Sequence, residues 1–258
     1  AGIGAPVEIL GVVTEGSENF LMELGGGVAT VSTMAEARRL SAAAARAGGQ
    51  LSVHLKLDSG MHRLGASRAE AEKLARFLND NARLEFEGAM THLSAAGSDH
   101  DHTARQLGEF ADFAAWLQSN GLNPEFLHTA NSATLALHPE ACYDMVRPGL
   151  AIYGIADPPE IAGKLDLVPA MRLCARVVNV KRVAAGEPVG YNCTWRAPRD
   201  STIATASIGY ADGLRTTMSN RGHALLRGRR VPVVGRVSMD FTALDVSELD
   251  DVRPGEEM

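Results

Sequence analysis

The chain has 258 residues, of which 45% are hydrophobic and 22% are charged, so it has enough apolar residues for a core and is not mainly disordered. The net charge of −6 argues against a dedicated binder of nucleic acids or anionic membranes. The three cysteines are odd in number and lack metal-site spacing, which favours a reducing compartment such as the cytoplasm. We find no secretory signal and no apolar run long enough to span a bilayer.

Strands and helices alternate along the first half of the chain. Residues 53–58 show the clearest strand pattern, because apolar Val53, Leu55 and Leu57 alternate with polar residues. Thr33 with Glu36, and Ser67 with Glu70, have the spacing of capping boxes at helix starts. The predicted strands are residues 6–12, 28–33, 53–58, 84–93, 126–130 and 145–154, and the predicted helices are 17–24, 34–47, 68–79, 102–119 and 132–137.

This alternation is typical of parallel βαβ units, and a (β/α)8 TIM-type barrel is the natural fold for it. Six of the eight barrel strands are present, so we expect the other two to lie before Ala1. After the Asp157-Pro158-Pro159 stretch the sequence becomes rich in β-branched residues and turn signals. We therefore predict an incomplete α/β barrel over residues 1–158 and a mostly β domain over residues 159–258.

Polar residues gather at the predicted carboxyl ends of the barrel strands, where barrels bind their ligands. Asn131 and Ser132 open a short helix that suits an anion. Together the residues at these strand ends form a mainly polar ring, which comprises Lys56, Asp58, Arg63, His92, His128, Asn131, Ser132, Arg147, Gly149 and Leu150.

Each signal in this ring has a plainer alternative. Asn131 and Ser132 are also ordinary helix caps, Arg63 has Asp58 as a scaffolding partner, and Lys56 has the stem to snorkel to the surface. The GSDHDH stretch places His100 and His102 in a polar loop without a third ligand in register, so we predict no metal site there.

Six motifs occur in this order along the chain: LKLDSGMHRLG, HTANSATLALHP, DMVRPGLAIYG, VGYNCTW, SIGYADGL and GRVSMDF. They resemble those of the alanine racemase family, whose members are barrel-type (fold-type III) enzymes that use pyridoxal phosphate (PLP). The resemblance covers nearly the whole chain. It implies the interconversion of L- and D-alanine, a reaction that supplies D-alanine for peptidoglycan.

The resemblance also implies roles for residues of the barrel. Arg147 would face the pyridine nitrogen of PLP, and His92 would bridge Arg147 to the catalytic tyrosine. Arg63 would contact the phenolic oxygen of the cofactor and the substrate carboxylate, and Lys56 would be carbamylated, because a buried ammonium beside Arg63 would be repelled. The phosphate would be held by Asn131, Ser132, Gly149 and Leu150.

Racemisation needs a base on each face of the α-carbon, and in this family the bases are the PLP lysine and a tyrosine that matches Tyr191. The tyrosine and the segment matching Met239 and Asp240 reach into the partner subunit's site, which implies a head-to-tail homodimer with shared active sites. Tyr210 would line the entrance to the site.

The sequence departs from the family pattern at the PLP lysine. The family carries that lysine in a segment of the type VKADAYGHG, and none of Lys56, Lys73, Lys164 and Lys181 lies in such a segment. We therefore expect this chain to be incomplete at its N-terminus and at its extreme C-terminus, and inactive on its own. Asn192 also stands where small residues are usual.

Two other functions stay open. One is a serine or broad-specificity racemase of the same class, because one hydroxyl is a small difference for a pocket. The other is a non-catalytic derivative without the PLP lysine. A basic-amino-acid decarboxylase is disfavoured by GYADG and GRVSMD.

Overall fold

A computed structural model describes residues 4–23, 25 and 27–258, so the predicted end of the first helix at Leu24 lies outside the described residues. The chain forms two compact units, Ala1–Ala170 and Met171–Met258. Among the described residues, no helix is both long and apolar enough to cross a membrane.

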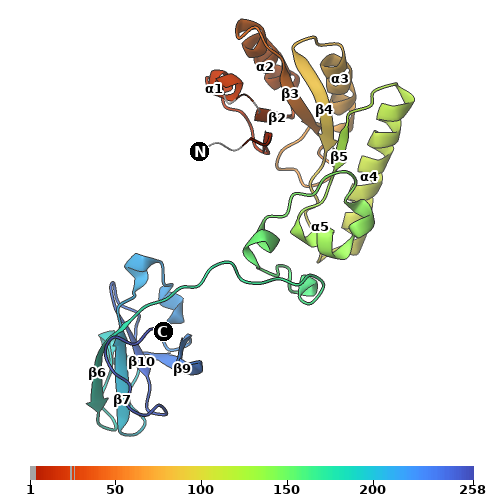
Figure 1. The fold of residues 1–258 in the computed structure, drawn as a ribbon. Coiled ribbons are helices and arrows are strands. Elements are labelled where there is room, and N and C mark those ends of the chain that lie inside the picture. The colour runs from red at the N-terminus through yellow and green to blue at the C-terminus, as the bar shows by residue number, and fades with distance from the viewer. Residues whose placement is uncertain (1–3, 24, 26) are drawn as a thin grey trace. The chain divides into compact units, whose positions relative to one another are not determined.

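The first unit is a parallel sheet of strands that alternate with helices along the chain (Figure 1). Its strands follow the order β1-β2-β3-β4-β5, and each neighbouring pair is parallel. The elements are β1 (Val7–Ile9), α1 (Glu18–Glu23), β2 (Gly27–Val31), α2 (Met34–Arg46), β3 (Leu51–Lys56), α3 (Arg68–Asn79), β4 (Leu84–Met90), α4 (His100–Ser119), β5 (Phe126–His128) and α5 (Ser132–Leu137).

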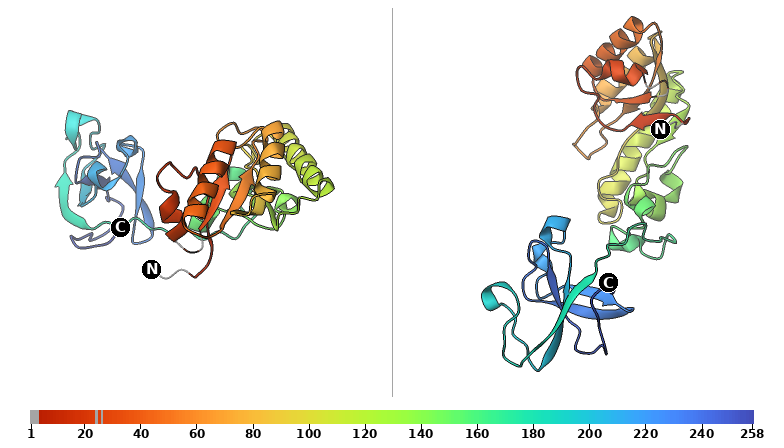
Figure 2. Two further views of the ribbon diagram at one scale, coloured as in Figure 1. Left: turned by 90° about the horizontal axis from the view of Figure 1, so that it is seen from above. Right: turned by 60° about the vertical axis from the view of Figure 1, so that its left-hand side comes forward.

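Helices α2, α3 and α4 pack against one face of this sheet (Figures 1 and 2). Val53 and Leu55 of β3 join Leu40 of α2, Leu74 of α3 and Phe110 of α4 in one apolar core. Side chains of a strand alternate between its two faces, so His54 and Lys56 lie on the opposite face, which is the interior of a barrel. Both are buried there.

The two predicted capping boxes have different outcomes. At α2 the Thr33 hydroxyl accepts the N–H of Glu36, and the Glu36 carboxylate accepts the N–H of Thr33, which confirms the first box. At α3 the Ser67 hydroxyl donates to the Glu70 carboxylate and makes no bond to the helix backbone. The second box is therefore wrong, although the helix starts where it was predicted.

The predicted sixth strand, residues 145–154, is also wrong. Only Val146 makes an isolated parallel bridge, to Ala130, and residues Leu150–Tyr153 form a 3-10 helix. Pro148 has no N–H to donate to a neighbouring strand, which prevents a continuous ladder at this point.

The second unit is an antiparallel sheet with the strand order β6-β7-β10-β9-β8. Its strands are β6 (Val177–Val183), β7 (Ser201–Ala206), β8 (His223–Leu226), β9 (Arg229–Val234) and β10 (Thr242–Asp245). Arg227 and Gly228 both have positive φ and join β8 to β9, as a tight hairpin turn requires. The parallel sheet followed by an antiparallel β unit confirms the predicted fold class.

Candidate active site at the carboxyl ends of the strands

The polar residues predicted to form a site do meet at the carboxyl ends of the parallel strands. Lys56 ends β3, His92 follows β4, and His128 ends β5. Arg147 lies beside them because its N–H donates to the carbonyl of Ala130 at 2.8 Å, which continues the sheet for one residue. The loop before the 3-10 helix thus brings Arg147 to the edge of the sheet formed by the carboxyl ends of the parallel strands.

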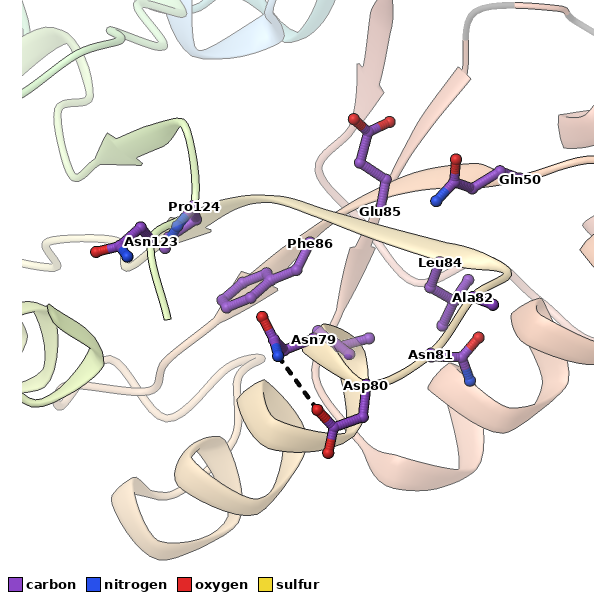
Figure 3. Close-up of a pocket in the computed structure, with 11 residues that line it drawn as sticks. Gln50, Asn79, Asp80, Asn81, Ala82, Leu84, Glu85, Phe86, Asn123 and Pro124 are labelled. Atoms are coloured by element: carbon purple, nitrogen blue, oxygen red, sulfur yellow. Dashed lines mark hydrogen bonds between the residues drawn. The ribbon is translucent and has the colours of Figure 1, made fainter. Parts of the chain in front are cut away.

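One hollow of about 510 Å³ contains most of the predicted cofactor residues, a size in the usual range for small-molecule sites. Its lining includes His92, Asn131, Ser132, Arg147, Gly149 and Leu150. A second hollow lies at the opposite edge of the sheet, where α3 meets the start of β4; Gln50, Asn79, Asp80 and Phe86 line it (Figure 3). The second hollow contains none of the predicted site residues, so the chemistry is assigned to the first.

Arg147 is held by three groups at the carboxyl ends of β4 and β5. Its guanidinium donates to Nδ1 of His128, to the carbonyl of Thr91 at 2.6 Å and to the carbonyl of Thr129 at 3.3 Å. Burial lowers the pKa of Arg147 to about 10, while the Glu8 carboxylate opposes this effect. The side chain therefore stays a cation at neutral pH, and its position is fixed.

Lys56 is a buried cation beside two others. Burial lowers the pKa of its ammonium first, and Arg63 and Arg147 lower it further, while Glu8 and Asp58 act in the opposite direction. The alternative of a snorkelling surface lysine is wrong, since Lys56 is 5% exposed. A bare ammonium is thus disfavoured at this place.

His92 faces the same positive field. Burial lowers its pKa to about 4, with further contributions from Arg147, Lys56 and Arg63. Its ring is consequently neutral at pH 7. Among the hydrogen bonds of the described residues, none joins the His92 ring to Arg147, whose nearest imidazole partner is His128. The sequence pattern placed His128 in the polar ring but gave no sign of this contact.

The segment from Asn131 to Ala151 carries hydrogen-bond donors suited to an anion. The Ser132 hydroxyl accepts the N–H groups of Gly149 and Ala151, at 3.0 and 3.2 Å. Asn131 is a true helix cap: its side chain accepts the N–H of Thr134 and donates to the carbonyl of Leu93. Because α5 has only six residues and the N–H groups of Gly149 and Ala151 already donate to Ser132, a donor for an anion here is the Ser132 O–H, not a long helix.

The loop after β3 is organised by Asp58, not by Arg63. The Asp58 carboxylate accepts the N–H groups of Gly60 and His62 and pairs with the His62 ring at 3.0 Å. Burial acts to raise the pKa of Asp58, but these contacts outweigh it and lower the pKa. Arg63 is exposed, and it takes part in no ion pair within the described residues, so the Asp58–Arg63 scaffolding alternative fails.

The β unit holds three further predicted site residues in two joined loops. Tyr210 donates its N–H to the carbonyl of Ser238, and Ala211 donates to that of Met239. A Cβ at Gly209 would lie 2.1 Å from the Met239 oxygen, so this close approach requires glycine. Met239, Asp240 and Tyr210 are therefore presented together, and all three are exposed.

Tyr191 lies in a separate short 3-10 turn of the same unit, and its side chain is 69% exposed. The next residue, Asn192, has a φ of 60°, in the left-handed region that asparagine tolerates better than most residues. A left-handed backbone at this position is therefore compatible with asparagine.

Comparisons with known proteins agree with this geometry. The family description "Alanine racemase, N-terminal domain" matches residues 1–157, and "Alanine racemase, C-terminal domain" matches residues 170–258. The alanine racemase of Symbiobacterium thermophilum is 40% identical over 258 residues, which cover 100% of this chain and 68% of that protein. The alanine racemase of Sorangium cellulosum is 42% identical over 211 residues, 81% of this chain.

The fold has relatives among solved structures as well. The crystal structure of alanine racemase from E. faecalis matches with a TM-score of 0.85 and 33% identity, covering 98% of this chain and 67% of that one. Measured against the two curated relatives, the matched region spans 55% and 68% of their lengths.

A parallel α/β unit with a basic hollow at its strand ends, followed by an antiparallel β unit, defines a two-domain barrel-and-β-domain protein. Both family descriptions match in the right order and together span most of the chain. The chain belongs to the alanine racemase family.

Proposed function

We propose that this protein interconverts L-alanine and D-alanine with PLP as its cofactor, and so supplies D-alanine for peptidoglycan in the cytoplasm. The observation that carries the proposal is the convergence of Lys56, His92, Ser132 and Arg147 at one edge of the parallel sheet. The proposal also rests on the names of its relatives.

The donor set fits PLP. A phosphate carries negative charge and strong acceptors, and the Ser132 hydroxyl, which accepts the N–H groups of Gly149 and Ala151, still has its own O–H to donate into the hollow. At the other end of the hollow, Arg147 is a held cation that cannot accept a proton, so it would donate to the pyridine nitrogen. Bound PLP would draw electrons from the α-carbon of the substrate and make its proton more acidic.

The chain's own residues would perform the remaining tasks. Arg63 would bind the substrate carboxylate, and a carbamylated Lys56 would fix the orientation of Arg63 by opposite charge. Neutral His92 would lie between Arg147 and the hydroxyl of Tyr191 and would transmit the electrostatic effect of the guanidinium to that hydroxyl. Tyr191 would hold and return the α-proton on one face of the substrate, and the PLP lysine on the other.

A homodimer would complete the site. Tyr191, Tyr210 and Met239 are 69%, 51% and 54% exposed, which leaves them available to a second copy. In the family the corresponding residues of one subunit reach the barrel of the other, so a head-to-tail arrangement is expected here.

The test is α-deuterium exchange into each enantiomer of alanine, catalysed by the full-length product of the gene with PLP. Tyr191→Phe should slow exchange by about 10²–10⁴-fold, most strongly for the enantiomer whose α-proton faces the tyrosine, because a general base contributes roughly that much. Tyr143→Phe is the matched control, since the Tyr143 ring packs edge-on against Phe110 in the other unit. Equal rates for Tyr191→Phe and the unaltered protein would refute the two-base assignment.

The same assay separates the two alternatives. Faster exchange with serine than with alanine would identify a serine racemase. Absence of exchange with every amino acid would favour the non-catalytic derivative, whose support is that Lys56, Lys73, Lys164 and Lys181 all lie outside the family's PLP-lysine segment.

A further inference from the structure

Two buried histidines lie behind Arg147, on the face of the sheet that a barrel encloses. His54 of β3 is 3% exposed and His128 of β5 is fully buried. Their rings lie 4.9 Å apart and nearly edge to face, and Nδ1 of His54 is 2.8 Å from Nε2 of His128. The proposed reaction assigns no task to His54.

The direction of the hydrogen bonds follows from Arg147. A guanidinium only donates, so Nδ1 of His128 must accept from it. Burial, with Arg147 and His54, lowers the pKa of His128 to about 2, so its ring is neutral and carries its one proton on Nε2. That proton points at Nδ1 of His54, which must accept it. His54 then carries its own proton on Nε2.

The structure provides a carboxylate for this last proton. Oε2 of Glu87 lies 3.4 Å from Nε2 of His54, an atom that is buried and has no hydrogen-bond partner among the described residues. The donors of Arg147 and His128 therefore point along one series that ends at His54, whose Nε2 lies near the Glu87 carboxylate without a hydrogen bond to it. Aligned hydrogen bonds of this kind strengthen one another in a low-dielectric interior.

The backbone of β4 is shaped around His54. The register with β3 passes from Val53↔Phe86 to His54↔Gly88, so Glu87 is the extra residue of a β-bulge, a device that redirects a side chain. A Cβ at Gly88 would lie 2.6 Å from Nε2 of His54, so only glycine leaves room for the ring. Bulge and glycine together allow the ring and the carboxylate to meet.

A metal site is the competing interpretation, because Glu8, His54 and His128 bring ligand atoms within 4.8 Å of one another. Two observations oppose it. The Nε2 atom of His128 is occupied by a proton when Nδ1 accepts from Arg147, and a metal ligand needs a free lone pair. The cationic guanidinium of Arg147 also contacts this group and would repel a metal ion. The Glu8 carboxylate, which lies 3.2 Å from Nδ1 of His54, is instead a counter-charge to Arg147, whose pKa it raises.

We infer that His54 is a positioning residue: by accepting the Nε2–H of His128, with the Glu87 carboxylate 3.4 Å from its own Nε2, it holds the His128 ring so that Nδ1 faces Arg147 and fixes the guanidinium. The contacts stand by themselves, whereas the benefit to catalysis rests on the proposed function, in which Arg147 faces the cofactor. The family resemblance assigns roles to Arg147 and His92 and none to His54, Glu87 or Gly88.

Nitrogen NMR of the 258-residue chain without cofactor tests the inference. The expected result is a proton on Nε2 of both His54 and His128, and restricted rotation of the Arg147 guanidinium. In His54→Leu the Arg147 guanidinium should rotate measurably faster, because a buried His128 Nε2–H without an acceptor no longer holds its ring, while the bonds to Thr91 and Thr129 remain. His54→Asn should restore the restriction, since its Oδ1 stands close to the place of Nδ1.

Two further variants keep the test decisive if His54→Leu does not fold. Glu87→Gln should weaken the restriction on Arg147, while Glu85→Gln, on the exposed side of the same strand, should leave it unchanged. A proton on Nδ1 of His54 or of His128 would overturn the inference, as would an unchanged Arg147 signal in a folded His54→Leu chain. Because no cofactor is present, failure of the racemase proposal would not alter these spectra.

Discussion

Arg147 and the imidazoles around it show how burial sets charge at the level of single residues. His128 and His92 have pKa values lowered to about 2 and about 4, with burial as the largest cause in each case and Arg147 as the next. Arg147 retains its charge because its own pKa falls only to about 10. One cation surrounded by neutral rings is the result, and the sequence alone could not show it, since it depends on depth and on a 19-residue separation between His128 and Arg147.

The lowered histidine pKa values predict an acid-dependent stability. An unfolded histidine has a pKa near 6.5, so below that pH the unfolded chain binds protons that the folded chain refuses. The contribution of each histidine to the free energy of unfolding is therefore fully present above pH 6.5. It is lost as the pH falls toward 4 for His92 and toward 2 for His128. Each group contributes a slope of up to about 1.4 kcal/mol per pH unit.

Urea unfolding at several pH values between 7.5 and 4.5 measures this slope. His128→Asn should be less stable than the unaltered chain at pH 7.5, but its free energy of unfolding should fall less steeply as the pH decreases. An identical slope in the variant would show that His128 does not remain neutral in the folded chain.

Lys56 carries the second prediction at this scale. Because Lys56 is buried beside two arginines, we expect its amine to react with carbon dioxide and become a carbamate, an anion that pairs with Arg63. Carbon-13 NMR of protein equilibrated with labelled bicarbonate should show one bound carbonyl signal. Lys56→Arg should remove the signal, and Lys73→Arg, at an exposed position on α3, should keep it. A signal that persists in Lys56→Arg would place the modification elsewhere.

At the scale of helices and strands, local sequence signals predicted which elements exist better than they predicted where each element ends. Period-two alternation identified β3 correctly, and cap residues located the starts of α2 and α3. The prediction failed at residues 145–154, where apolar composition resembled a strand but Pro148 interrupts pairing. It also missed the bulge at Glu87, because an extra residue leaves no mark in an alternating pattern until the partner strand is known.

The two helix caps provide a matched experiment. Thr33→Ala removes a hydroxyl that accepts the N–H of Glu36 and should lower the free energy of unfolding by about 1 kcal/mol. Ser67→Ala should change it by only a few tenths of a kcal/mol, because the Ser67 hydroxyl contacts a side chain and not the helix backbone. Denaturant titrations of both variants compare the costs directly, and a larger loss at Ser67 would contradict the assignment of the caps.

At the scale of the whole molecule, the six linked motifs predicted the family, whereas composition and periodicity predicted only the class of fold. Strand-end polar residues identified the edge of the sheet that carries the hollow, since parallel strands bring their carboxyl ends together. The contacts that hold Arg147 were not predictable, because the carbonyls of Thr91 and Thr129 belong to backbone whose position is set by packing. Nor could spacing reveal that Asp58 binds His62 in preference to Arg63.

The lysine inventory carries the last prediction. A PLP enzyme binds its cofactor covalently through a lysine placed in the site. Lys73, Lys164 and Lys181 are exposed, and Lys56 is the residue expected to become a carbamate, whose nitrogen is no longer an amine that can react with an aldehyde. Borohydride reduction of the 258-residue chain with PLP should therefore give scattered, partial labelling and no stoichiometric adduct at one lysine. Extending the chain with a VKADAYGHG-like segment should produce one, at the added lysine. Mass mapping of peptides distinguishes the outcomes, and a complete adduct at Lys56, Lys73, Lys164 or Lys181 in the unextended chain would mean that this protein has recruited a different lysine for the reaction.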